Sequence, residues 1–168
     1  AQRAADIAVR DVNGDGLADV LTVWDAHGYG LTWHEQRRDA SGQILWKRHD
    51  ILSAEPDGSA EHLRISQMHA LACGDLGGDG RPGLVVGKRY WAHGPSGDVE
   101  SDAPAVLCWF RPRLEGKDVR FVPHLIHDDS GAGTQVLLAD VDGDGRLDVL
   151  TSNKKGTFVH LNRMEQGR

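Results

Sequence analysis

One pattern occurs three times in this 168-residue chain and constrains its fold more than any other feature. Each copy is a short apolar run, a loop rich in Gly and Asp, and a second apolar run. The copies are DIAVRDVNGDGLADVLTVWD (6–25), HALACGDLGGDGRPGLVVGKR (69–89) and QVLLADVDGDGRLDVLTSNKK (135–155). Their first loop aspartates, Asp11, Asp75 and Asp140, are 64 and 65 residues apart. Two nearly equal spacings indicate internal repetition.

Each copy is predicted to begin an antiparallel sheet. Third apolar runs follow at 31–33, 106–110 and 158–161, and fourth runs follow in the first two units at 44–52 and 119–126. Short runs rich in Val and Leu, bounded by Gly and Asp, are strand signals, and no stretch shows a sustained period of 3.6 residues. Four strands repeated at a fixed interval are typical of β-propeller blades.

We therefore predict an all-β fold, a β-propeller segment of about three four-stranded antiparallel blades. The blade units are expected at about 5–52, 66–127 and 133–163, with the last blade incomplete. Closed propellers typically use four to eight blades, so fewer than three would leave edge strands open. Residues 1–168 are expected to form one segment of a larger propeller, whose partners are the remaining blades or other copies of the chain.

The first and third loops have the composition of a calcium site. Oxygen-bearing side chains stand at positions 1, 3, 5 and 9, and Gly at position 6 allows a sharp turn. Ca²⁺ takes six to eight oxygen ligands, and the carbonyl of position 7 can supply another. Asx-rich turns without metal are the alternative. The predicted Ca²⁺ ligands are Asp11, Asn13, Asp15, Leu17 and Asp19 in the first loop, and Asp140, Asp142, Asp144, Arg146 and Asp148 in the third.

The second loop, Asp75 to Gly83, departs from this pattern. Gly77 and Gly83 occupy positions 3 and 9, so two potential ligands are lost. Weak or no calcium binding is expected there.

The loops and their flanking runs resemble the FG-GAP and VCBS repeat family, the blades of integrin-α-like propellers and of many secreted bacterial proteins. The resemblance covers all three units. It implies that calcium binds between the first two strands of a blade and braces it. It also implies an extracellular or periplasmic location, with any signal peptide outside this chain.

The other loops are expected on the opposite face, because successive strands alternate in direction. Many polar residues fall there, and the loop from 88 to 104 is longer than a plain turn requires. We predict a site for a carbohydrate or another polar small molecule; a solvated loop face is the alternative. The candidate ligand-binding residues are Asp25, His27, Tyr29, Asp129, Gln135, Asn153, Lys154 and Lys155, with His62, His127 and Asp128 nearby.

A narrower resemblance concerns SQMHALACGD, VVGKRYWAHG, PHLIHDDSGAGTQ and TSNKKGTFVHL, which are similar to the propeller part of aldos-2-ulose dehydratase-type proteins. It implies binding of an oxidised sugar and a carbon–oxygen lyase reaction. Such a reaction needs a base beside a carbonyl and an electrophile for the enolate oxygen. His69 and His93, both expected in loops, are candidate bases. Lys88, Arg89 or a second metal would be the electrophile, and Tyr90 the acid. A purely structural or adhesive repeat is the third hypothesis.

Composition excludes several other classes. The formal charge is −6, from 19 basic and 25 acidic residues, which disfavours nucleic acid and anionic membranes as partners. No apolar run approaches the roughly 20 residues of a membrane span. No phosphate loop, nucleophile elbow or paired-cysteine zinc pattern is present. Cys73 and Cys108 lie in apolar runs and are expected to be buried thiols.

Overall fold

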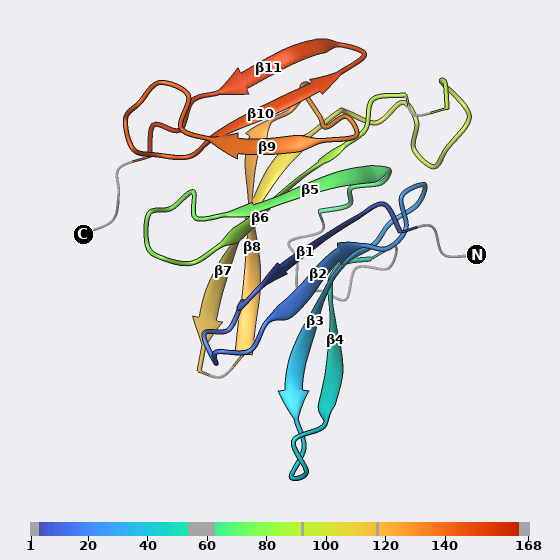
Figure 1. The fold of residues 1–168 in the computed structure, drawn as a ribbon. Helices are drawn as coiled ribbons and strands as arrows, with labels where there is room; N and C mark the ends of the chain where they lie inside the picture. The colour runs from blue at the N-terminus through green and yellow to red at the C-terminus, as the bar shows by residue number, and fades with distance from the viewer. Residues whose placement is uncertain (1–3, 54–62, 92, 117, 165–168) are drawn as a thin grey trace.

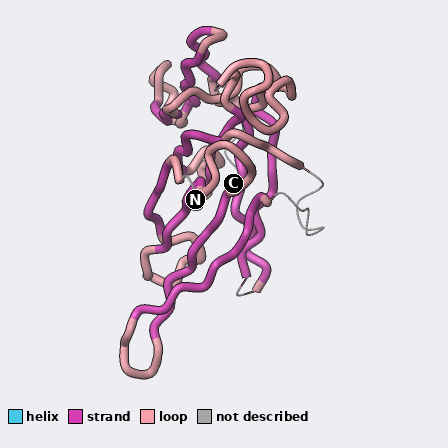
Figure 2. Tube along the Cα trace, turned by 90° about the vertical axis from the view of Figure 1, so that its right-hand side faces the viewer, coloured by secondary structure: helices cyan, strands magenta, loops and turns pink. Residues whose placement is uncertain are grey.

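The computed structural model describes residues 4–53, 63–91, 93–116 and 118–164. Within these residues the chain forms eleven strands joined by loops and turns (Figures 1 and 2), and the predicted all-β fold is confirmed. None of the described residues belongs to a helix that could cross a membrane.

The first unit is a four-stranded antiparallel sheet in the order β1-β2-β3-β4. Its strands are β1 (Asp6–Arg10), β2 (Asp19–Val23), β3 (Leu31–Arg38) and β4 (Ile44–Leu52). β3 runs five residues beyond the expected apolar run, because its polar outer half pairs with β4 in a long exposed hairpin.

The second unit repeats this arrangement in the order β5-β6-β7-β8. Its strands are β5 (Met68–Gly74), β6 (Gly83–Lys88), β7 (Leu107–Glu115) and β8 (Asp118–His127). The segment between β6 and β7 is the long loop predicted from the sequence.

The third unit is a sheet of three antiparallel strands in the order β11-β10-β9. They are β9 (Val136–Ala139), β10 (Asp148–Asn153) and β11 (Gly156–His160). The described residues of this unit contain no fourth strand, as expected from the missing fourth apolar run. Sheets of four, four and three strands are consistent with partial propeller blades.

The core lies between neighbouring sheets, which explains the unbroken apolar run Leu84 to Val86 in β6, an inner strand of the second unit. All six residues of β6 are buried. Val86 packs in a cluster with Leu21 and Trp33 of the first unit, whereas Val85 packs in a second cluster with Val149 of the third unit. A strand covered on both faces favours a continuous apolar run over alternation. The sheets therefore pack face to face, as blades do.

The repeat also extends to the contacts between units. The amide of Gln67, just before β5, donates to the carbonyl of Gly28 in the first unit at 2.9 Å. The amide of Ala132, before β9, donates to the carbonyl of Lys88 in the second unit at 3.1 Å. The second and third units are thus each hydrogen-bonded to the unit before them. The bond reaches either the end of the second strand of the earlier unit or the turn that follows that strand.

The loops separate onto two ends of the molecule. The loops that join β1 to β2, β5 to β6 and β9 to β10 lie on the left of Figure 1. The loop between β2 and β3 and the long loop between β6 and β7 lie on the right, together with the β10–β11 turn. We call the end with the β1–β2, β5–β6 and β9–β10 loops the acidic-loop end. The end with the β2–β3 loop, the β6–β7 loop and the β10–β11 turn is the candidate ligand end.

Both cysteines are free thiols, as the sequence indicated. Cys108 is buried and Cys73 is partly buried. Burial raises the pKa of each thiol to about 11, so both stay protonated and weakly reactive near neutral pH.

Candidate functional site

The first and third acidic loops have the same internal hydrogen bonds. In the third loop, Asp140 Oδ1 accepts the amides of Gly143 at 2.8 Å and Asp144 at 3.1 Å, and Oδ2 accepts the amide of Gly145 at 2.9 Å. In the first loop, Asp11 accepts the equivalent three amides at 2.8, 3.2 and 2.9 Å. The position-1 carboxylate therefore holds the turn in both loops.

Glycine is required at two positions in each of these loops. Gly14 and Gly143 both have φ of 79°, and Gly16 and Gly145 both have φ of 83°. Residues other than glycine rarely adopt a backbone conformation in this left-handed region. The identical dihedral angles show that the two loops share one backbone conformation.

In the first and third loops, the aspartate at position 9 connects the loop to the third strand of its unit or to the residues that follow that strand. Asp19 accepts the amides of Val12 at 3.2 Å and Gln36 at 2.8 Å, and its side chain is fully buried. Asp148, also fully buried, accepts the amides of Val141 at 2.9 Å and Asn162 at 2.8 Å. These bonds satisfy backbone donors that would otherwise be buried without partners, so position 9 has a structural role besides its predicted one as a ligand.

The third loop brings three carboxylates together. Oxygens of Asp140, Asp142 and Asp148 lie within 4.8 Å of one another. A cluster of carboxylate oxygens with an adjacent carbonyl is the donor set that Ca²⁺ prefers, so the residues fit the ion. Arg163 balances the charge of the loop through bonds to Asp142 at 2.9 Å and Asp144 at 3.1 Å. Its side chain is 60% exposed and can swing away from the loop.

The first loop differs in one ligand. Asn13 replaces the position-3 carboxylate and donates its amide to Asp15 at 3.1 Å. The amide oxygen of Asn13 also accepts the Asp15 amide at 3.0 Å. The first loop therefore offers fewer negative charges to a cation than the third loop does.

In the second loop, an arginine lies beside the position where the first and third loops carry the oxygen-bearing side chains of Asn13 and Asp142. Asp75 still accepts the amides of Asp79 and Gly80, so the turn is kept. The guanidinium of Arg111 bonds Asp79 at 2.8 Å and would lie 3.5 Å from a Cβ at Gly77, the position-3 residue. At position 9, a Cβ on Gly83 would collide with the indole of Trp109. The missing ligands of the second loop are visible in the sequence. The arginine beside them is not, because Arg111 is more than 25 residues away from the loop along the chain.

At the candidate ligand end, the first group consists of histidines and one aspartate. Asp98 bonds Nδ1 of His27 at 3.0 Å and Nδ1 of His93 at 2.8 Å. The ring of His69 meets that of His27 edge-on at 5.1 Å. Burial favours the neutral form of Asp98, but the bonds from His93 and His27 outweigh it and lower the pKa of the carboxyl.

His69 lies within β5 and not in a loop, so this expectation was wrong. Its Nδ1 bonds the carbonyl of Gln67 at 3.1 Å. Burial lowers its pKa, with a further decrease from the nearby Arg89.

A second group surrounds the aromatic pair Tyr90 and Trp91. Their rings stack at 5.2 Å with an interplanar angle of 14°. The ammonium of Lys155 lies 4.7 Å from the centre of the Tyr90 ring and also pairs with Asp129. Lys154 donates to the carbonyl of Trp91 at 2.5 Å. Trp91 is 38% exposed, which leaves aromatic surface open to a ligand.

Arg64 connects the third group, which surrounds Tyr29. Its guanidinium donates to the Tyr29 hydroxyl at 2.8 Å, stacks on that ring at 4.6 Å, and lies 3.7 Å from Glu100. Neither Arg64 nor Glu100 was predicted from the sequence, because charged loop residues carry no motif.

Several predicted ligand residues have structural bonds of their own. Asp25 accepts the amide of Gly28 at 3.1 Å and closes the β2–β3 turn. Asn153, at the end of β10, bonds the carbonyl of Ser130 and the amide of Lys155. Gln135 is exposed beside β9.

Lys88 is the last residue of β6, not a loop residue as expected, and only 2% of it is exposed. Its ammonium donates to Ser66 at 2.9 Å, and burial lowers its pKa. Arg89 is held through its backbone, which bonds Gln67 and pairs with Ala132. His127 ends β8, Asp128 is exposed, and His62 lies outside the described residues.

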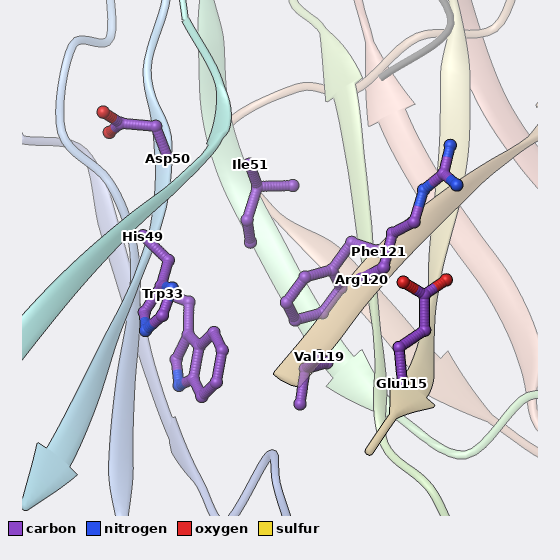
Figure 3. A pocket seen from close by; sticks show the side chains of 8 residues that line it. All are labelled: Trp33, His49, Asp50, Ile51, Glu115, Val119, Arg120 and Phe121. Atoms are coloured by element: carbon purple, nitrogen blue, oxygen red, sulfur yellow. The ribbon is translucent and has the colours of Figure 1, made fainter. Parts of the chain in front are cut away.

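A pocket of about 270 Å³ lies away from both groups of loops, between β3 and β4 on one side and β7 and β8 on the other (Figure 3). Trp33 and His49 stack at 4.3 Å along one wall, opposite Phe121 and Val119. His49 Nε2 bonds Glu35 at 2.8 Å. Within the described part of the chain, none of the residues predicted from the sequence as site residues lines this pocket.

Comparison with known proteins supports one part of the resemblance. Residues 132–161, which include β9, the third acidic loop and β10 to β11, match the family model of the FG-GAP repeat. No curated protein matches the chain. The match supports the FG-GAP family and a β-propeller module, whereas the narrower resemblance to aldos-2-ulose dehydratases has no support.

Proposed function

We propose that this chain is a calcium-braced β-propeller segment whose candidate ligand end binds a carbohydrate. The bracing rests on the shared geometry of the first and third loops, in which the position-1 carboxylate holds a tight turn that carries further oxygen-bearing side chains. Calcium there would connect the first two strands of each blade. An exported location fits this proposal, because free Ca²⁺ is high outside the cell.

The stacked pair Tyr90 and Trp91 carries the carbohydrate part of the proposal. Sugar rings present C–H faces that pack against aromatic rings and hydroxyl groups that need hydrogen-bonding partners. Trp91 offers exposed aromatic surface, and the ammonium groups of Lys154 and Lys155 lie beside it. An apolar platform next to charged donors suits a saccharide better than a wholly apolar ligand.

The exposed faces of the outer sheets support a larger propeller. Ile7 and Val9 of β1 are 62% and 49% exposed, and Leu137 of β9 is 50% exposed. The second unit covers one face of each neighbouring sheet, so a further blade on either side would cover these side chains.

A panel of immobilised neutral and acidic polysaccharides tests the carbohydrate proposal. We expect the chain with Ca²⁺ to bind at least one of them, and Trp91→Ala to weaken that binding at least about tenfold, since loss of a central aromatic contact costs upwards of about 1.4 kcal/mol. Trp46→Ala is the matched control, because Trp46 on β4 is 50% exposed in a different sheet position.

The proposal would be contradicted if the chain bound no polysaccharide, or if Trp46→Ala weakened polysaccharide binding as much as Trp91→Ala does. The lyase alternative can be tested in the same mixtures, because elimination of water would leave an unsaturated sugar product that is detected by its absorbance. Loss of product formation in His69→Ala with binding retained would favour that alternative.

A further inference from the structure

We propose that His27, His93 and Asp98 form a binding site for a transition-metal ion of the Zn²⁺ class, separate from the acidic loops. His27 comes from the β2–β3 loop of the first unit, and the other two come from the long β6–β7 loop of the second. One ligand atom of each residue lies within 4.8 Å of the others. This inference goes beyond the proposed function, because it depends on the cluster alone and holds whether or not a glycan binds.

Asp98 is the centre of the cluster. Each of its two carboxylate oxygens bonds a different imidazole, at 3.0 Å to His27 and 2.8 Å to His93. The side chain of Asp98 is only 6% exposed. A buried carboxylate requires a compensating positive charge, and a cation shared with two imidazoles supplies it.

The donor atoms determine the class of metal. Two imidazole nitrogens and one carboxylate oxygen suit Zn²⁺ and its neighbours among the transition metals. Ca²⁺ and Mg²⁺ prefer all-oxygen sets, which the acidic loops offer instead. The two ends of the molecule are therefore selective for different ions.

The spacing requires little rearrangement. Zinc bonds of about 2.0–2.2 Å in a tetrahedral site place neighbouring ligand atoms roughly 3.4 Å apart. The nitrogen–oxygen distances here are 3.0 and 2.8 Å, so along these two contacts the ligand atoms would move apart by about half an ångström as the ion replaces the shared protons. His93 can make this adjustment, since its side chain is 54% exposed.

Three protein ligands leave a fourth tetrahedral position open. His69 lies near the cluster, with its ring 5.1 Å from that of His27. Its bond to the Gln67 carbonyl places the proton on Nδ1 and leaves the Nε2 lone pair free. The open position can take water or an oxygen of a ligand bound at this end of the molecule.

Metal titration of the full chain tests the site directly. Saturating Ca²⁺ first fills the acidic loops, and Co²⁺ is then followed by its visible absorption, with Zn²⁺ added as the competitor. We expect one Zn²⁺ per chain in addition to Ca²⁺. His27→Ala and Asp98→Asn should each weaken Zn²⁺ binding at least about tenfold.

Two variants serve as controls. Asp102→Asn removes an exposed carboxylate from the same loop, and His34→Ala removes an imidazole from β3. Both should bind Zn²⁺ as the wild type does. Absence of Zn²⁺ binding in the wild type, or equal affinity in all four variants, would overturn the proposal and leave Asp98 as a brace of the long loop. Thermal melts in Ca²⁺ confirm that each variant is folded, and a failure of glycan binding would leave this result unchanged.

Discussion

Arg111 illustrates how one residue can take over the electrostatic role of a bound cation. In the second loop its guanidinium bonds Asp79 and lies beside Gly77, where the first and third loops carry Asn13 and Asp142. The bond to Arg111 lowers the pKa of the Asp79 carboxyl. The second loop is thus neutralised from within the chain.

Arg111→Ala is expected to lower the free energy of unfolding by about 0.5–1 kcal/mol at neutral pH, because the ion pair is partly exposed. The pKa of Asp79 is lowered in the folded state. The contribution of this ion pair to the free energy of unfolding is therefore complete above the unfolded pKa of about 3.9. It is lost as the pH falls through the pKa of Asp79 in the folded state. Urea unfolding at pH 7 and pH 3 measures this difference, with Arg113→Ala on the same strand as control. An effect of Arg111→Ala that does not shrink at pH 3 would contradict the account.

Asp148 has a different role, in which hydrogen bonding does not depend on metal. Asp148→Ala would leave the amides of Val141 and Asn162 without their acceptor. The Asn162 amide is buried, and an unsatisfied buried donor costs about 1–3 kcal/mol, so we expect a loss in this range even in EDTA. Chemical unfolding without calcium measures this loss. Asp144→Ala is the control, because Asp144 is exposed and bonds the side chains of Arg146 and Arg163 and the amide of Arg146, none of which is fully buried. Equal small losses in both variants would argue that Asp148 serves only as a ligand.

At the scale of elements, periodicity predicted most of the fold. β4 has the expected bounds, because its ends coincide with changes from apolar to turn residues. The ends of β3 and β7 were not predictable, since hairpin pairing extends them through charged, exposed residues such as Arg37 and Arg113. Strand pairing there overrides the local preference of the side chains.

The acidic loops were predictable, and so was the presence of His27 and His93 at one end, whereas their connection through Asp98 was not. A loop motif is local in sequence, so spacing within nine residues identifies it. Asp98 and His27 are 71 residues apart and meet only because two blades pack face to face. No periodic signal connects such residues, and only the folded chain brings them together.

At the scale of the whole molecule, the three sheets share two clusters of apolar side chains and leave their outer faces open. The second unit contributes to both clusters, and β6 is buried on both sides. The −6 formal charge is also a property of the whole chain, since the first and third acidic loops alone hold seven carboxylates. Binding of two Ca²⁺ ions would bring the formal charge to about −2.

We propose that two of the three acidic loops, the first and the third, bind calcium and brace the blades. Calorimetric titration of the calcium-free chain tests it most directly. We predict two Ca²⁺ per chain and a melting temperature several degrees higher in Ca²⁺, since ligand at about 100 times its Kd adds about 2.7 kcal/mol. Asp11→Ala and Asp140→Ala should each remove one site, whereas Asp75→Ala should leave both. Absence of binding, or the same two sites in Asp140→Ala, would contradict the account.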